Sequence, residues 1–114
     1  MPMSRRHEVL DLLSKLEREK LGQMARQRGV IEQRLSQANA ERGRLVRSRL
    51  DAREAPAVEA LGHLAAFDKR MVARITRCEQ DADALRIEHR AAGDEISESW
   101  RRSKALQIVS RRSS

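Results

Sequence analysis

Aromatic residues are almost missing from this chain of 114 residues, since Phe67 and Trp100 are the only two and there is no tyrosine. Charged residues make up 36% of the chain, so few large apolar side chains remain for a wide globular core. The single cysteine, Cys78, cannot form a disulfide within the chain, and we interpret it as a small core residue. The composition favours narrow helical interfaces over a compact globular domain.

Patterns for membrane insertion and catalysis are also missing. No apolar stretch approaches the roughly 20 residues that cross a membrane, and no hydrophobic segment marks a secretory signal. The histidines His7, His63 and His89 are scattered, and no His or Cys pair has metal-ligand spacing. The chain has neither a glycine-rich phosphate loop nor a nucleophile elbow. We therefore expect a cytoplasmic protein without enzyme activity, cofactor or metal.

What the chain does contain is two runs of residues with alternating three- and four-residue spacing, which is typical of coiled-coil seams. The first run contains Leu21, Met24, Arg28, Ile31, Leu35, Ala38, Arg42 and Leu45. The second run contains Leu61, Leu64, Asp68, Met71, Ile75, Cys78, Ala82, Leu85, His89, Ala92 and Ile96. Pro56 lies between them and cannot sit inside a continuous helix. The sequence predicts an all-α fold in which two long helices form an antiparallel coiled-coil hairpin.

The predicted hairpin covers residues 1–114 as a single domain. Its expected parts are a helix over about 4–53, a turn at about 54–56, a helix over about 56–109 and a disordered basic tail at about 110–114. A turn at this place pairs residues whose numbers sum to about 109 or 110. The resulting pairs are Leu45 with Leu64, Ala38 with Met71, Ile31 with Cys78, and Met24 with Leu85. The same register sets His89 opposite Lys20 or Leu21.

The first helix has an irregular start in this prediction. Val9, Leu13 and Leu16 lie one step out of phase with Leu21, as a four-residue stutter in the seam would require. The stutter would keep these three side chains in the interface and place Val9 beside Trp100. Trp100 would then close the seam, contact a partner, or do both, because an aromatic ring next to arginines is typical of binding hot spots.

Charge is concentrated at the two ends of the chain. All 17 acidic residues lie between Glu8 and Glu98, and that span is formally neutral. The net charge of +7 comes from the residues outside it, which are Arg5, Arg6, Arg101, Arg102, Lys104, Arg111 and Arg112. A hairpin brings the chain ends together, so we expect one basic tip. Such a tip either docks into an acidic cavity or is a solvated tail.

Small residues recur every seven positions beside the first seam, at Gly22, Gly29, Ser36 and Gly43. Glycine inside a helix costs roughly 0.5 to 1 kcal/mol relative to alanine. Three interpretations stay open: another backbone approaches there, the helix bends there, or the glycines are tolerated drift.

Phe67 early in the second helix and the Trp-Arg-x-x-Lys-x-Leu stretch at 100–106 resemble the FliJ family of flagellar export proteins. The family's non-flagellar relatives are the stalk proteins of type III secretion, the YscO group. This resemblance implies a coiled-coil stalk that couples a hexameric export ATPase to the cytoplasmic domain of the export gate and meets export chaperones. It also implies a location at the inner face of the bacterial cell membrane, and a role in motility or protein secretion.

By the same resemblance, the basic tip would enter the export ATPase through Arg5, Arg6, Trp100, Arg101, Arg102 and Lys104. An outward face around Phe67 and Met71 would contact the export gate. Two alternatives from other classes stay open. The pI near 10.9 permits nucleic-acid binding, although antiparallel helices with a neutral shaft do not fork across a DNA groove. The glycine positions also permit self-association into a four-helix scaffold.

Overall fold

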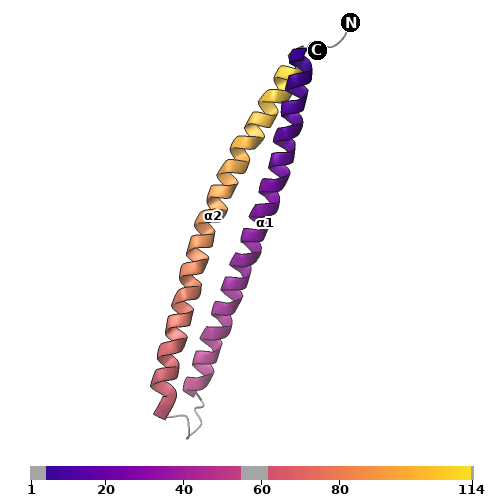
Figure 1. The fold of residues 1–114 in the computed structure, drawn as a ribbon. Helices are drawn as coiled ribbons and strands as arrows, with labels where there is room; N and C mark the ends of the chain where they lie inside the picture. The colour runs from indigo at the N-terminus through magenta and orange to yellow at the C-terminus, as the bar shows by residue number, and fades with distance from the viewer. Residues whose placement is uncertain (1–4, 55–61, 114) are drawn as a thin grey trace. The chain divides into compact units, whose positions relative to one another are not determined.

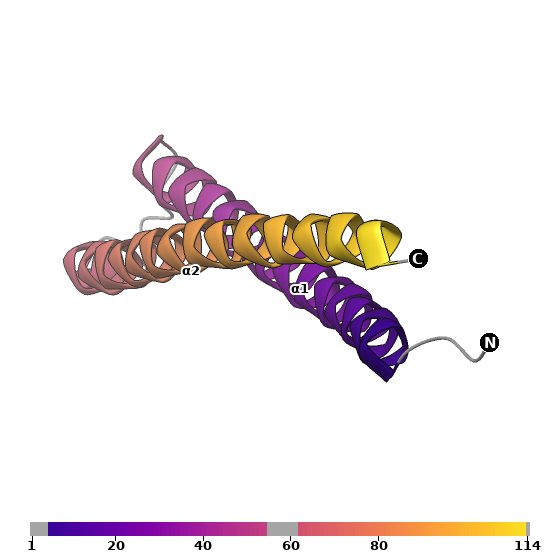
Figure 2. The ribbon, with the colours of Figure 1, turned by 90° about the horizontal axis from the view of Figure 1, so that it is seen from above.

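The computed structural model describes residues 5–54 and 62–113, which form two long α-helices (Figure 1). Helix α1 runs over Arg5–Glu54 and helix α2 over Leu64–Ser113, and each has 50 residues. A 3₁₀ turn at residues 62–63 precedes α2. Figure 2 shows the helices running in opposite directions. The predicted all-α fold with an antiparallel pair of helices is confirmed.

The helix bounds differ from the prediction on the second helix. Residues 110–113, which we expected to be disordered, continue α2. Arg111 and Arg112 in the last turn suit the negative end of the helix dipole. The α-helical part of the second arm begins only at Leu64, after the 3₁₀ turn. Pro56, Leu61 and most of the expected turn lie outside the described residues, and Glu54 is the last residue of α1.

The chain divides into two compact units, and each contains a piece of both helices. Unit 1 comprises Met1–Val30 with His89–Ser114, and unit 2 comprises Ile31–Glu88. The expectation that residues 1–114 act as one hairpin domain concerns both units together and stays a prediction. Neither helix, as far as it is described, has an apolar stretch that could cross a membrane.

Unit 2 contains an apolar core in which Leu45, Met71 and Ile75 are buried. Val46, Phe67 and Cys78 are partly buried and pack against this cluster. The interpretation of Cys78 as a small core residue is therefore confirmed.

An ionic cluster lies beside this core and satisfies a carboxylate in the seam. Asp68 on α2 accepts two hydrogen bonds from Arg49 on α1, at 2.6 and 3.2 Å, and a third from Arg53 at 3.3 Å. The hydrogen bonds from Arg49 hold the pKa of Asp68 below its ordinary value, and the same bonds raise the pKa of Arg49. Asp68 stays charged in the seam because two guanidinium groups reach it from the facing helix.

In unit 1 the most deeply buried seam positions hold serines. The buried residues among those described in unit 1 are Ser14, Ser99 and Ser103. Ser99 Oγ donates a 2.7 Å hydrogen bond to Glu17 Oε2 across the pair, whereas the buried Ser14 Oγ has no partner among the described residues. The apolar seam residues of this unit are only partly buried, so its interface gains less from the hydrophobic effect than the core of unit 2. These residues are Leu10, Leu21, Met24, Ala92 and Ile96.

The predicted stutter in α1 is wrong, because the seam continues without a phase change. Leu10, Ser14 and Glu17 extend the three- and four-residue spacing upstream of Leu21, and all are at least partly buried. The residues predicted for this stretch of the seam are exposed instead; they are Val9, Leu13 and Leu16. In the first turns of α1, polar residues therefore occupy seam positions while apolar residues lie outside the seam.

The predicted register is also wrong, by about one heptad. Glu17 contacts Ser99 and Arg49 contacts Asp68, so the paired residue numbers sum to 116 and 117. A shift of seven residues leaves the same positions in the seam, so the periodicity alone cannot detect it. The length of the connection decides the register. Since α1 ends at Glu54 and α2 begins at Leu64, the midpoint of the connection lies near residue 59 and not at the predicted turn.

Apart from these corrections, the predicted seam positions are confirmed. From Leu21 to Leu45 on α1 and from Leu64 to Ile96 on α2, every predicted seam residue is at least partly buried except Arg42. Arg42 reaches outward from the seam edge and forms a 3.3 Å ion pair with Glu79 on α2.

The polar seam residue His89 lies near Arg28, and not near Lys20 or Leu21. Arg28 Nη2 is 3.5 Å from His89 Nδ1. The same guanidinium group lies over Gly93, where a methyl group would come within 2.9 Å of Arg28 Nη2. Gly93 therefore leaves the space that this arginine fills.

Candidate partner-binding site

An aromatic side chain stands exposed on α2 of unit 1. Trp100 is 54% exposed, and Lys104 Nζ lies 5.4 Å from the centroid of its ring, which is a cation–π distance. Ile108, one further turn along α2, is also exposed. At about 100° per residue, positions four apart on a helix lie on one side of it. We call Trp100, Lys104 and Ile108 the Trp100 stripe.

The serine seam explains why Trp100 lies outside the helix pair. Ser99 and Ser103 face α1, so the residue that follows each of them points to the side by about 100°. The interpretation in which Trp100 closes the seam beside Val9 is therefore wrong. A large ring that a helix pair leaves in solvent is available to another molecule.

The basic residues predicted for the same site do not all lie beside Trp100. Arg101 is exposed and adjoins the Trp100 stripe. Arg102 is exposed as well, but it lies about 200° around the helix from Trp100 and therefore on the other side. Arg5 and Arg6 are exposed on α1, where the observed register places them opposite residues near 111. That point is about 16 Å along α2 from Trp100.

The residues predicted to contact the export gate do not form an outward face. Met71 is buried in the core of unit 2, and Phe67 packs against that core. The prediction of an exposed contact surface here is wrong because Met71 occupies a seam position, which the spacing of the second run already indicated.

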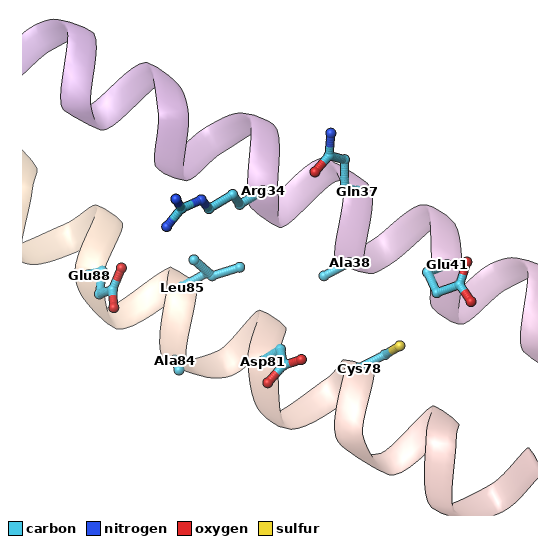
Figure 3. A pocket seen from close by; sticks show the side chains of 9 residues that line it. All are labelled: Arg34, Gln37, Ala38, Glu41, Cys78, Asp81, Ala84, Leu85 and Glu88. Carbon is cyan, nitrogen blue, oxygen red and sulfur yellow. The ribbon is translucent and has the colours of Figure 1, made fainter. Parts of the chain in front are cut away.

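A hollow of about 500 Å³ lies between α1 and α2 of unit 2 (Figure 3). It is lined by Arg34, Gln37, Ala38, Glu41, Cys78, Asp81, Ala84, Leu85 and Glu88. Ala38 and Ala84 are too short to fill the space, which is why the surface is hollow there. Glu41 is already bonded to Arg44 at 2.7 Å and to Arg74 at 3.4 Å.

The hollow has no arrangement for chemistry. The Cys78 thiol has no histidine among the lining residues to activate it. Within residues 5–54 and 62–113, no three His, Cys, Asp or Glu side chains gather as metal ligands would. The Trp100 stripe is therefore the stronger candidate for a functional surface.

Sequence reasoning identified Trp100 and Lys104 but missed Ile108 as part of the same surface. The signal was present, because Ser99 and Ser103 continue the spacing of the second seam beyond Ile96. Comparisons of the chain with family models, with curated proteins and with solved structures find no match.

Proposed function

We propose that this protein is a non-enzymatic coiled-coil stalk of a bacterial type III export apparatus, similar in role to FliJ-like proteins. It works in the cytoplasm at the inner face of the membrane, where it binds the hexameric export ATPase and meets the export gate and export chaperones. The observation that carries the proposal is the exposed Trp100 ring with Lys104 over it, at the basic end of a helix pair.

The Trp100 stripe supplies the ATPase contact in this proposal. Burial of an aromatic ring at the centre of an interface provides much of the binding energy, while cations around it select an acidic surface. Arg101 and Lys104 adjoin the ring and complement acidic side chains on the ATPase. Arg102, on the other side of α2, contributes less. Binding favours whichever state of the ATPase ring offers this contact, so the stalk shifts an existing equilibrium without chemistry of its own.

The test is stimulation of a hexameric export ATPase, measured as phosphate release while the protein is titrated in. We expect the wild-type chain to stimulate hydrolysis. The Trp100→Ala variant should need about 30-fold more protein for half-maximal stimulation, which corresponds to the roughly 2 kcal/mol of a hot-spot residue. Ile87→Ala is the matched control, because Ile87 is also exposed on α2 but lies in unit 2.

A second pair of variants tests the orientation of the surface. Arg101→Glu and Arg102→Glu make the same charge change at neighbouring positions, of which Arg101 adjoins the Trp100 stripe and Arg102 lies on the far side of α2 from Trp100. Arg101→Glu should weaken stimulation far more than Arg102→Glu. Equal effects would mean that net charge alone attracts the partner. Absence of stimulation by the wild-type chain would remove the ATPase from the proposal.

A further inference from the structure

Unit 1 exposes a second apolar surface, on α1. Val9, Leu12, Leu13 and Leu16 have exposed fractions between 42% and 58%. Their spacing of three, four and seven residues places them on one side of the helix within two turns. Single exposed leucines are common, but four neighbouring apolar side chains form a contiguous surface that water covers at a cost. We call these four residues the α1 patch.

The α1 patch takes no part in pairing the helices of unit 1. The seam of α1 runs through Leu10, Ser14 and Glu17, about 120° around the helix from the centre of the patch. The fully buried residues described in this unit are serines, whereas Leu12, Leu13 and Leu16 are exposed. The Trp100 stripe belongs to the other helix, where the observed register sets Trp100 at the level of Leu16.

We propose that a second copy of this chain covers the α1 patch, with the two α1 helices antiparallel and a twofold axis between residues 12 and 13. Under this symmetry Val9 faces Leu16 of the other copy, and Leu12 faces its Leu13. The apolar surface is thus complementary to itself, as a twofold interface requires. This inference does not depend on the proposed export function.

The charges beside the patch select the antiparallel arrangement. Glu8, Lys15 and Glu19 lie along one edge of the patch, and Arg5 lies one turn before Val9, in line with the patch. Antiparallel copies place Glu8 within two residues of the level of Lys15 and Arg5 within one residue of the level of Glu19, and the twofold axis repeats both pairs. They also bring Arg5 level with Lys20, so two attractive pairs stand against one repulsive pair. Parallel copies would instead place Lys15 near Lys20, a repulsive pair. Lys15 now contacts Asp11 in its own helix at 3.8 Å, between two exposed side chains, so this contact is easily exchanged.

The size of the patch predicts a weak dimer. A standard interface buries about 800 Å² on each partner, and four half-exposed side chains supply less than this. We therefore expect a dimer that forms and dissociates with concentration.

Sedimentation velocity over a wide range of protein concentrations tests the proposal. The wild-type chain should shift from monomer to dimer, and Leu12→Lys should stay monomeric at every concentration where the wild type is dimeric. Val30→Lys is the matched control, since Val30 is similarly exposed on α1 in unit 1 but lies well beyond the patch. Circular dichroism should give equal helix content for all three proteins. A wild-type chain that stays monomeric, or a Leu12→Lys variant that dimerises as well as the wild type, overturns the proposal.

Disulfide trapping tests the orientation. Val9→Cys and Leu16→Cys are made separately in a Cys78→Ala background, mixed and oxidised, and the linked peptides are identified by mass spectrometry. The antiparallel arrangement predicts that the link between positions 9 and 16 exceeds the links of each position to itself. Links of 9 to 9 and 16 to 16 in equal or greater amounts contradict the antiparallel pairing.

Discussion

Replacing Ile75 by Ala tests whether the apolar core of unit 2 stabilises the helix pair. Ile75 is only 9% exposed and belongs with Leu45 and Met71 to the described core. The substitution removes three carbon atoms, each worth about 0.8 kcal/mol when buried, so we expect a loss of about 2 kcal/mol. A narrow interface between two helices collapses easily around the deleted side chain, so the cavity adds little to this cost.

Val72→Ala is the control for this prediction. Val72 is adjacent in sequence but 40% exposed, and the better helix propensity of alanine offsets much of its lost contact. Urea unfolding followed by circular dichroism should lower the midpoint of Ile75→Ala by about 1 M, since small proteins lose about 1 to 3 kcal/mol of stability per molar urea. Val72→Ala should stay close to the wild type. Equal midpoints for the two variants would refute the assignment of the core.

Two further predictions concern glycine and charge. Gly29→Ala should raise the melting temperature, because an added methyl group meets nothing within 4 Å and alanine stabilises a helix interior by about 1 kcal/mol relative to glycine. A lower melting temperature would show that the space beside Gly29 is not open. Asp68 has a lowered pKa, so its ion pairs stabilise unit 2 above the ordinary aspartate pKa of about 3.9, and this stability is lost as pH falls through the lowered pKa. Asp68→Asn should therefore melt below the wild type at pH 7 and converge with it in acid, and a gap that persists in acid would refute the linkage.

The periodicity of the sequence predicted the architecture and most of the seam. Ile31, Leu45, Ile75 and Ala82 were identified as interface residues because apolar side chains at these spacings have one common face. The register could not be predicted in the same way. A shift of one heptad buries the same residues, so only the bounds of the helices, Glu54 and Leu64, fix the pairs.

The two exposed surfaces of unit 1 were harder to predict, since hydrophobicity and burial disagree there. Leu13 and Leu16 were placed in the seam because they are apolar, whereas the structure buries Ser14 and partly buries Glu17 at the positions that continue the spacing. The same displacement applies to Trp100, which follows the buried Ser99. Giving the unbroken spacing priority over hydrophobicity would have placed all of these residues correctly.

Fluorescence of Trp100 tests most directly whether this ring lies outside the helix pair and is free for a partner. The chain has one tryptophan, so its emission reports on this site alone. We predict that the native protein emits at nearly the wavelength of the urea-unfolded chain and is quenched by acrylamide to nearly the same extent. Adding the export ATPase should shift the emission to shorter wavelength and protect the ring. A native protein whose emission is already at short wavelength, and whose ring acrylamide cannot reach, would place Trp100 between the helices and contradict the account.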